Sequence, residues 1–493
     1  MKLSKPLSIL ITQARAKMYK IKSSRGTKQK LPSKIALDHF DFFYGPIFKN
    51  RWNSIRLGLL TDQKLCALMN NFTTIDASIE RLTDSGAIDM KDLLLETAET
   101  NSDGEDRRST KRMSNVVVRK QIRSKVTNEE NFDVGKNREN FLSTNSEDLA
   151  NEEDMKLRSS PESIYSFVPS SDRVVRLRDD FEVSSMLPEK QPLMRPADIR
   201  IVPDDDIIYP NMLKVMLYPR GDITTFDDAP LTVENVPAYY LMGASTIFAV
   251  LALNLKLDDQ VLDLCMSPGG TSLSILQTLL PGRVVCNDVT MKMRGRQTLE
   301  DFIPATAKDV RSKVALWYKD PSISDNWDKD AVRGKFDKVL INAPCTYDRE
   351  SVSHSTDDEP SLFSEGRNAE KLKLPFRQAE LLKAGLLCLK PGGSLVYTTQ
   401  SLSPIQNDSV IDNALNSLNG QISKPDSSHQ EETRLTSNDF VINDLSVLAE
   451  KFCRAGIFRF FPFCRYGELI VPNICSNFGP AYVCKFTRKL EKS

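Results

Sequence analysis

Two apolar runs in this chain end in side chains that could take part in chemistry. The run VLINAPCTYDR (339–349) carries Cys345, and the run SLVYTT (394–399) is followed directly by Gln400. If both runs are neighbouring parallel strands, their carboxyl ends share one edge of a sheet, which is where open α/β sheets bind ligands. A thiol at such an edge is either a nucleophile or a small buried filler, and the choice depends on its pKa. Composition alone favours the filler interpretation for Cys345.

A third stretch, VLDLCMSPGGTSLSILQ (261–277), indicates a ligand-binding turn between a buried strand and a helix. Glycines at 269 and 270 let the backbone approach a ligand closely, and the following helix N-terminus attracts a carboxylate or phosphate. Asp288 ends the next apolar run, 18 residues after Gly270, about where an acid meets ribose hydroxyls in nucleoside-binding folds. This spacing fits a dinucleotide or S-adenosylmethionine equally. Neither GxGxxG nor GxxxxGK[ST] is present, and the alternative is a tight turn with a helix-capping Asp.

Short apolar runs alternate with helical patterns over the C-terminal part of the chain. The predicted strands are residues 260–265, 283–288, 313–318, 337–343 and 394–399, and the predicted helices are 271–280, 291–301 and 375–389. The last helix has Pro375 near its start, Lys390 in its last turn and two glycines after it. Residues 456–473 and 481–487 suggest a closing antiparallel hairpin. The sequence therefore predicts an α/β fold: a Rossmann-like, doubly wound, mostly parallel sheet with an antiparallel C-terminal edge.

The rest of the chain divides by composition. Residues 1–37 contain ten Lys or Arg and no acid, which predicts a mitochondrial transit peptide or, alternatively, a basic arm that binds RNA or a partner. Residues 38–95 read as an N-terminal helical segment that packs on the core, with helical spacing at Ile55–Leu60 and at Leu65–Met69. Residues 96–198 are too polar to bury much surface and predict a largely disordered insertion. The α/β domain is expected at 199–493, with a surface loop at about 419–439.

The composition of the whole chain indicates no charge-selected partner, no metal site and no membrane span. Lys plus Arg and Asp plus Glu are equal at 66 each, so net charge indicates no partner. The nine cysteines form no CxxC pair and there are three histidines, so no metal site is expected. No run approaches the roughly 20 apolar residues of a membrane span.

The motifs together resemble one protein family. The resemblance rests on FYGPIFKNRWNSIRLGLLTDQKLCALMNNF (43–72), YPRGDI (218–223), YYLMGAS (239–245), VLDLCMSPGG (261–270), NDV (287–289), VLINAPCTYDR (339–349), LPFRQAELLKAGLLCLKPGGSLVYTT (374–399), SLSPIQND (401–408) and GELIVPNICSNFGPAYVCK (467–485). In this order they are similar to the NSUN family of S-adenosylmethionine-dependent RNA cytosine-C5 methyltransferases, in particular its mitochondrial ribosomal-RNA branch. Only the N-terminus and the two polar insertions fall outside the resemblance.

The resemblance implies a site and a chemistry. In the family, a cysteine thiolate in a TC motif adds to cytosine C6, C5 then attacks the methyl group of S-adenosylmethionine, and a second cysteine in a PC motif helps release the product. A Lys after the glycine pair and the Asp of a DxPC motif hold the cofactor or the flipped base. Carried onto this chain, the catalytic positions are Cys345 and Gln400. The implied cofactor-binding positions are Cys265, Ser267, Pro268, Gly269, Gly270, Thr271, Asp288 and Asn342.

This sequence departs from the family at most of these positions. Gln400 stands in the place of the attacking cysteine, Thr271 in the place of the Lys, and Asn342 in the place of the DxPC Asp. Residues 316–319 read LWYK where the branch has Trp-Asp-Gly. Only Cys345 and Asp288 match. An amide cannot add to C6, and loss of a covalent nucleophile commonly costs several orders of magnitude in rate.

Three functions remain open on these residues. The first is a mitochondrial rRNA cytosine-C5 methyltransferase in which Cys345 takes over the attack. The second is a catalytically impaired family member that binds rRNA and an MTERF-type helical-repeat partner during mitoribosome assembly, in the mitochondrial matrix. The third is a nucleotide-binding α/β protein unrelated to RNA. Contacts to RNA are expected from basic residues on the crevice side, namely Arg220, Arg294, Arg296 and Arg349.

Overall fold

The computed structural model describes residues 31–99, 197–288, 294–320, 332–353, 361–364, 366–420 and 435–490. The helices are α2 (Pro32–Phe48), η1 (Lys49–Arg51), α3 (Trp52–Leu60), α4 (Asp76–Asp84), α5 (Met90–Glu99), α11 (Ala244–Ala252), α12 (Gly270–Gln277), α13 (Arg294–Phe302), α14 (Lys308–Lys313), α15 (Asp348–Ser353), α16 (Asn368–Cys388), α17 (Asp408–Gly420), η5 (Ser437–Asp439) and α18 (Ser446–Arg454). The strands are β1 (Cys66–Met69), β2 (Ile88–Asp89), β3 (Ile201–Pro203), β4 (Val215–Leu217), β5 (Tyr239–Met242), β6 (Gln260–Asp263), β7 (Arg283–Asn287), β8 (Val314–Trp317), β9 (Phe336–Asn342), β10 (Leu389–Thr399), β11 (Phe440–Asp444), β12 (Phe460–Phe461), β13 (Glu468–Ile470) and β14 (Ala481–Arg488).

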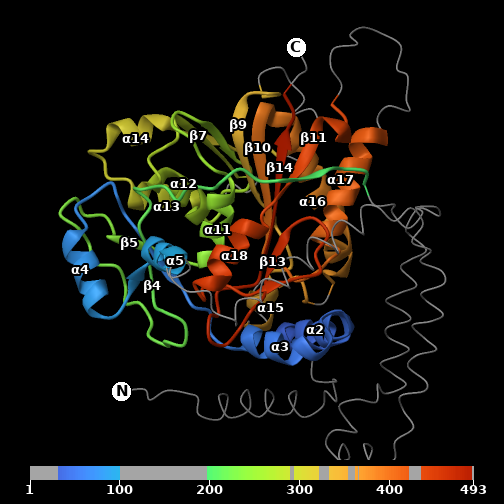
Figure 1. The fold of residues 1–493 in the computed structure, drawn as a ribbon, viewed down its shortest axis with the longest axis horizontal. Coiled ribbons are helices and arrows are strands. Elements are labelled where there is room, and N and C mark those ends of the chain that lie inside the picture. Colours follow the sequence, from blue (N-terminus) through green and yellow to red (C-terminus); the bar gives the residue numbers. More distant parts are fainter. Residues whose placement is uncertain are drawn as a thin grey trace, which may run out of the picture. The chain divides into compact units, whose positions relative to one another are not determined.

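The large sheet has the predicted Rossmann-like architecture. Its strands run in the order β12-β13-β14-β10-β9-β6-β7-β8. Off this path, β11 pairs with β14, next to which it is seen in Figure 1, and β3 pairs with β11. The pairs from β8 to β10 are all parallel, whereas β14 is antiparallel to β10, β11 and β13. All five predicted parallel strands are present, and the antiparallel C-terminal edge is confirmed. The fold is therefore α/β with a doubly wound, mostly parallel sheet.

Side chains of alternating direction bury both faces of this sheet, as a parallel sheet requires. Leu340 of β9 and Val396 of β10 belong to the apolar cluster that includes Phe248 of α11 and Leu273 of α12. Ile341 follows Leu340 along β9, and Leu395 precedes Val396 along β10. Both side chains therefore face α16 instead, where Gly385 leaves room for them. Helices α11 and α12 thus cover one face, and α16 covers the other.

A second, four-stranded sheet corrects the prediction for residues 38–95. Its order is β2-β4-β1-β5 and its pairs are antiparallel, so it joins residues 66–89 to residues 215–242. The run Leu65–Met69, predicted to be helical, contains strand β1. All four of its strand residues are buried, and a short run that is apolar throughout cannot be assigned by periodicity. The predicted helix over Ile55–Leu60 is confirmed as part of α3.

Several boundaries also differ from the predictions. Helix α2 begins at Pro32, so residues 32–37 belong to the folded part of the chain and Ala36 is buried. Helix α16 begins at Asn368, which places Pro375 inside the helix and not near its start. Helix α17 extends into the predicted 419–439 loop as far as Gly420. The transit-peptide hypothesis for residues 1–30 and most of the 96–198 prediction fall outside the described residues.

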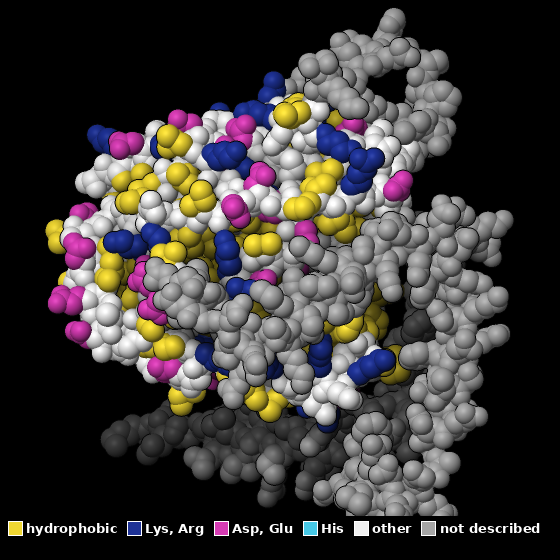
Figure 2. Space-filling model, in the orientation of Figure 1, with side chains coloured by type: hydrophobic (Ala, Val, Ile, Leu, Met, Phe, Trp, Pro, Cys, Tyr) yellow, Lys and Arg dark blue, Asp and Glu magenta, His cyan; other side chains and the backbone are white. Residues whose placement is uncertain are grey.

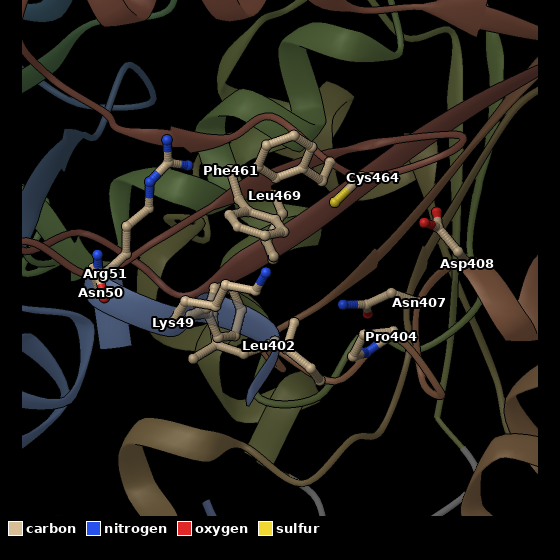
Figure 3. Close-up of a pocket in the computed structure, with 13 residues that line it drawn as sticks. Lys49, Asn50, Arg51, Leu402, Pro404, Asn407, Asp408, Phe461, Cys464 and Leu469 are labelled. Carbon is tan, nitrogen blue, oxygen red and sulfur yellow. The ribbon is translucent and has the colours of Figure 1, made fainter. Parts of the chain in front are cut away.

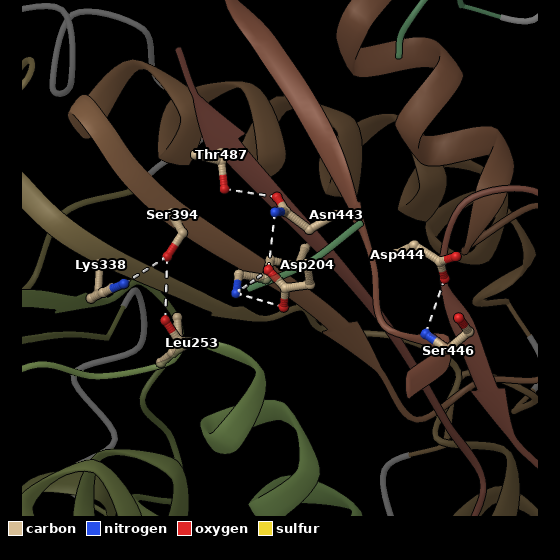
Figure 4. Close-up of polar contacts among 9 residues, drawn as sticks. Asp204, Leu253, Lys338, Ser394, Asn443, Asp444, Ser446 and Thr487 are labelled. Carbon is tan, nitrogen blue, oxygen red and sulfur yellow. Dashed lines mark hydrogen bonds and ion pairs between the residues drawn. The ribbon is translucent and has the colours of Figure 1, made fainter. Parts of the chain in front are cut away.

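The antiparallel edge and the neighbouring strands β9 and β10 bury two sets of polar groups (Figure 4). The ammonium of Lys485 lies 2.8 Å from both carboxylate oxygens of Asp204, and Asn443 donates to the same carboxylate at 3.0 Å. Lys338 donates to the hydroxyl of Ser394, and burial lowers the pKa of this lysine to about 8. These groups join β3, β11 and β14 to one another, and β9 to β10, whereas the backbone pairing of β14 with β10 joins the antiparallel edge to the parallel sheet.

Candidate functional site

The carboxyl ends of five strands meet at one edge of the sheet through backbone hydrogen bonds. Beyond β6, Leu264 N–H donates to Leu340 of β9 and Met266 N–H donates to Asn287 of β7. Beyond β9, Ala343 N–H donates to Thr398 of β10 at 2.9 Å. Asp288 N–H, beyond β7, donates to Trp317 of β8 at 3.0 Å. The turns that follow these strands therefore form one continuous edge, and the sequence-predicted site residues lie on it.

The β6–α12 turn has the shape expected of a ligand-binding turn. Gly269 has φ +115°, a backbone conformation that side chains with a Cβ rarely adopt, and a Cβ there would lie 2.8 Å from Thr298. The carbonyl of Pro268 accepts a hydrogen bond from the Thr298 hydroxyl at 2.7 Å, which fixes the turn against α13. Ser267 and Pro268 are exposed, Cys265 is half-buried, and the N-terminus of α12 opens toward this edge.

Two carboxylates lie beside this turn. Asp288 is buried at the end of β7, as predicted. Asp263, at the end of β6, was not singled out from the sequence, although it stands in an apolar strand where a buried acid is unusual. Its carboxylate accepts a hydrogen bond from Ser272 at 2.6 Å, and burial raises its pKa to about 6.

Thr271 and Asn342, two positions where the chain departs from the family pattern, lie against each other. The side-chain amide of Asn342 is 3.5 Å from the hydroxyl of Thr271. Thr271 is buried in the first turn of α12, and Asn342 is half-buried at the end of β9. The resemblance places a Lys and an Asp at these two positions. In this chain a neutral pair therefore stands where the family has two charges.

Cys345 and Gln400, the two predicted catalytic positions, are also in contact. The backbone N–H of Gln400 donates to the sulfur of Cys345 at 3.3 Å. Cys345 is 1% exposed, and burial, with a smaller contribution from the Asp348 carboxylate, raises the pKa of its thiol. The thiol is accordingly protonated at neutral pH in this conformation.

A hydrogen-bond network that the sequence did not reveal fixes the region around Cys345. The buried carboxylate of Asp348, three residues after Cys345, accepts hydrogen bonds from the Tyr44 hydroxyl and the Leu402 N–H, both at 2.7 Å. The hydroxyls of Thr346 and Ser401 donate to it as well. Tyr44 lies in α2, some 300 residues away in sequence, so no local pattern could have indicated this contact. The network ties the N-terminal helix to the β9 and β10 turns.

The arginines expected to contact RNA do not form one group. Arg349 is 8% exposed, and its guanidinium donates to the carbonyls of Gly58, Thr61 and Gly479 and to the Asn477 side chain. The prediction that Arg349 contacts RNA is therefore wrong, because this side chain is used to hold loops together. Arg294 and Arg296 are exposed at the start of α13, and Arg220 is exposed near Gly456.

Neither a metal centre nor a membrane span finds support among the described residues. On the face drawn in Figure 2, acidic side chains gather over α4 at the left and basic ones are scattered. Within the described ranges, no group of three or more His, Cys, Asp or Glu side chains is arranged to hold a metal ion. In the same residues, no helix is both long and apolar enough to cross a bilayer.

Comparison with known proteins gives relatives that match nearly the whole chain. Residues 250–447 match the family described as 16S rRNA methyltransferase RsmB/F. The "5-cytosine rRNA methyltransferase nsun-4" of Caenorhabditis elegans is 33% identical, and the match covers 98% of this chain and 98% of that protein. The "5-cytosine rRNA methyltransferase NSUN4" of Bos taurus is 29% identical, with 94% of this chain and 91% of that protein covered.

Solved structures are more distant. A methyltransferase homolog protein from Pyrococcus horikoshii is 15% identical, with a TM-score of 0.41, over 93% of this chain and 98% of that one.

Proposed function

This chain belongs to the NSUN family of RNA cytosine-C5 methyltransferases, and we propose that it methylates a cytosine of mitochondrial small-subunit rRNA during mitoribosome assembly. The family supports rRNA cytosine as the substrate, since the matching relatives are named 5-cytosine rRNA methyltransferases. The basic, acid-free N-terminal segment supports import into the mitochondrial matrix.

The position of Cys345 carries the proposal. Its sulfur accepts a hydrogen bond from the backbone N–H of Gln400, the residue that stands in the place of the family nucleophile. A thiol is thus present within hydrogen-bond distance of the position from which the family attacks C6. The N–H donor stabilises the thiolate once the thiol loses its proton, because a hydrogen bond to the charged form favours that form. We assign Cys345 as the attacking thiol, and we assign no chemical step to the Gln400 side chain.

The residues of the β6–α12 turn fit S-adenosylmethionine. The N-terminus of α12 suits a carboxylate, such as that of the methionine part, and buried Asp288 offers a carboxylate to ribose hydroxyls. Cys265, Ser267, Pro268, Gly269 and Gly270 would form the backbone wall of this site, and Thr271 and Asn342 its inner side. When bound, S-adenosylmethionine supplies the methyl group.

In the reaction, the residues of the protein bind the cytosine, orient it and attack its C6 atom. The thiolate of Cys345 forms a bond to C6 of the cytosine, which makes C5 nucleophilic; after methylation, loss of the C5 proton allows the bond between sulfur and C6 to break. The amide of Asn342 can hydrogen-bond the cytosine edge, since it offers both a donor and an acceptor. Burial of Cys345 requires that the β9 and β10 turns move when the base enters, so that the thiol becomes accessible.

A second candidate function is assembly without methylation. It is favoured by the amide at Gln400, by the burial and raised pKa of the Cys345 thiol, and by the neutral Thr271–Asn342 pair. In this case the fold would bind rRNA and an MTERF-type partner, and the crevice would serve for binding only. Copurification with a tagged chain would identify such a partner.

A methyl-transfer assay separates the two candidates. The full chain is incubated with a transcript of small-subunit mitochondrial rRNA and S-adenosylmethionine that carries a labelled methyl group. Transfer by the wild type, and a loss of at least about a thousandfold in Cys345→Ser, support the enzyme. Cys453→Ser is the matched control, since Cys453 is exposed on α18. RNA binding without any transfer by the wild type would instead support assembly alone.

The same question can be asked in cells by bisulfite sequencing of the small-subunit rRNA after knockdown. A 5-methylcytosine that disappears, returns with the wild type and does not return with Cys345→Ser supports methylation. An unchanged 5-methylcytosine pattern together with a loss of small subunits contradicts it.

A further inference from the structure

A pocket with a volume of about 540 Å³ lies beside the turn that follows β10 (Figure 3). Its walls come from the end of α2 with η1, from the turn after β10, and from β12, β13 and the segment between them. The lining residues are Ile47, Phe48, Lys49, Asn50, Arg51, Leu402, Pro404, Asn407, Asp408, Phe461, Phe463, Cys464 and Leu469. Leu402 is two residues beyond Gln400. The sequence interpretation did not predict this pocket, because three distant segments build it.

The floor of the pocket is apolar and fixed, whereas its rim carries an exposed aromatic ring. Phe48, Leu402 and Leu469 are buried, and the rings of Phe48 and Phe461 are 4.7 Å apart in an edge-on arrangement. Phe463 is 61% exposed, with its ring centroid 5.3 Å from that of Phe461. An exposed phenylalanine held at the mouth of an apolar pocket gives a flat surface on which a planar group can stack.

Two cations complete the rim. The guanidinium of Arg51 lies 5.9 Å from the ring centroids of both Phe461 and Phe463, and Figure 3 shows the Lys49 side chain extending over the pocket. Among the residues that the structure describes, neither cation has a carboxylate within ion-pair distance. The carboxylate of Asp408, which also lines the pocket, accepts hydrogen bonds from the Tyr482 hydroxyl and from the backbone N–H groups of Arg465 and Tyr466. The lining residues thus carry two cations, Lys49 and Arg51, against one carboxylate, so the net charge around the pocket is positive.

The backbone of Lys49 adds an independent observation. Lys49 has φ 48° and ψ −129°, an unusual conformation for a residue with a Cβ, at the point where α2 ends. Glycine would adopt this conformation without strain. Strained residues of this kind cluster at binding sites, where the side chain is needed.

From this arrangement we propose that the pocket binds an unpaired nucleotide of the RNA, with the base stacked on Phe463 and the backbone phosphate held by Lys49 and Arg51. Aromatic rings interleaved with unpaired cations are the chemistry of single-stranded RNA recognition. A purely apolar protein segment would leave both cations unmatched, and an acidic peptide would leave the rings unused. The inference rests on the proposed function, since that function brings RNA to the neighbouring turn.

The test is fluorescence anisotropy of a labelled single-stranded RNA oligonucleotide with the full chain at several salt concentrations. We expect Phe463→Ala to weaken binding by about 5- to 100-fold, the range for loss of one stacked base. Phe42→Ala is the matched control, because Phe42 is 68% exposed on α2 and does not line the pocket. We expect Arg51→Ala to weaken binding and to reduce the slope of log affinity against log salt by about one, whereas Lys34→Ala should do neither.

Lys49→Gly separates binding from folding. Glycine removes the backbone strain at this position, so we expect a melting temperature at or above that of the wild type. We also expect weaker RNA binding, because the variant lacks the Lys49 ammonium. A Phe463→Ala variant that binds RNA within twofold of the wild type would overturn the inference. The inference would also be overturned if Phe463→Ala kept its RNA affinity and lost only the binding of a protein partner. Methyl transfer is measured in parallel. If the wild type transfers no methyl group while Phe463→Ala still loses RNA affinity, the methylation proposal fails and the pocket assignment stands.

Discussion

Two regions of the large sheet bury polar groups of different kinds. At the antiparallel edge, where β3, β11 and β14 meet, the charges of Lys485 and Asp204 are paired at 2.8 Å, with side-chain exposures of 4% and 7%. At the carboxyl edge, the central contacts are neutral: an amide against a hydroxyl, and a backbone N–H against a thiol. A buried, hydrogen-bonded ion pair fixes strands, whereas a partly open edge with neutral central contacts can accept a ligand. Changes at the first should therefore affect folding, and changes at the second should affect chemistry.

The largest expected effect is the return of a thiol to the carboxyl edge. Gln400→Cys restores the family nucleophile, and we expect its methyl-transfer rate to exceed that of the wild type by at least about a hundredfold, because a thiolate at this position is half exposed and Cys345 is buried. The rate is measured with labelled methyl donor and rRNA transcript, and Gln400→Ser is the control. An unchanged rate would mean that more than the nucleophile has been lost at this edge.

Removal of one partner from the buried ion pair of Lys485 and Asp204 should reduce stability without affecting chemistry. Asp204→Ala leaves the ammonium of Lys485 buried and unpaired, and we expect the free energy of unfolding to fall by about 3–5 kcal/mol. Denaturant unfolding gives this value. The double variant Asp204→Leu with Lys485→Met should recover most of the loss. RNA affinity per folded molecule should stay at the wild-type level, and a specific loss of binding would contradict the comparison.

Asp263 should make stability depend on pH. Its folded pKa of about 6 lies above the ordinary 3.8, so the folded chain takes up a proton before the unfolded chain as the pH falls. This group alone should raise the free energy of unfolding by about 2 kcal/mol between pH 6 and pH 4, out of about 3 kcal/mol over its full titration, since one pKa unit is about 1.4 kcal/mol. Asp263→Asn should lack this rise. Equal pH profiles of the wild type and the variant would show that the carboxylate is not desolvated.

The smallest expected effect concerns the neutral pair. Thr271→Lys alone places an ammonium at a buried position next to an amide, and Asn342→Asp alone places a carboxylate next to a hydroxyl. Together the two should be less destabilising than the sum of the single changes, by about 0.5–3 kcal/mol in a double-mutant cycle. A coupling energy of zero would show that the two side chains do not interact as the 3.5 Å contact indicates.

Sequence reasoning succeeded where the signal was local and failed where it was not. The parallel strands were predictable because apolar, β-branched runs between helical patterns leave few alternatives in an α/β chain. Strand β1 was mistaken for helix because its four residues are buried on both faces, by partners more than 140 residues away. Arg349 was assigned to the surface because a lone arginine is usually solvated, and only the loops around Gly58 and Gly479 give it buried acceptors.

By itself, the sequence determined the fold class, the ligand edge at the strand ends and the identity of the residues there, including the amide at Gln400. These features follow from local sequence patterns and from the order of the motifs, and both can be read along the chain without knowledge of its packing. Only the tertiary structure decided that Asn342 lies against Thr271, that Cys345 is buried beneath the Gln400 turn, and that Lys49, Arg51 and Phe463 surround one pocket. Contacts and desolvation depend on which distant segments pack together, and this packing sets both the pKa of a thiol and the shape of a pocket.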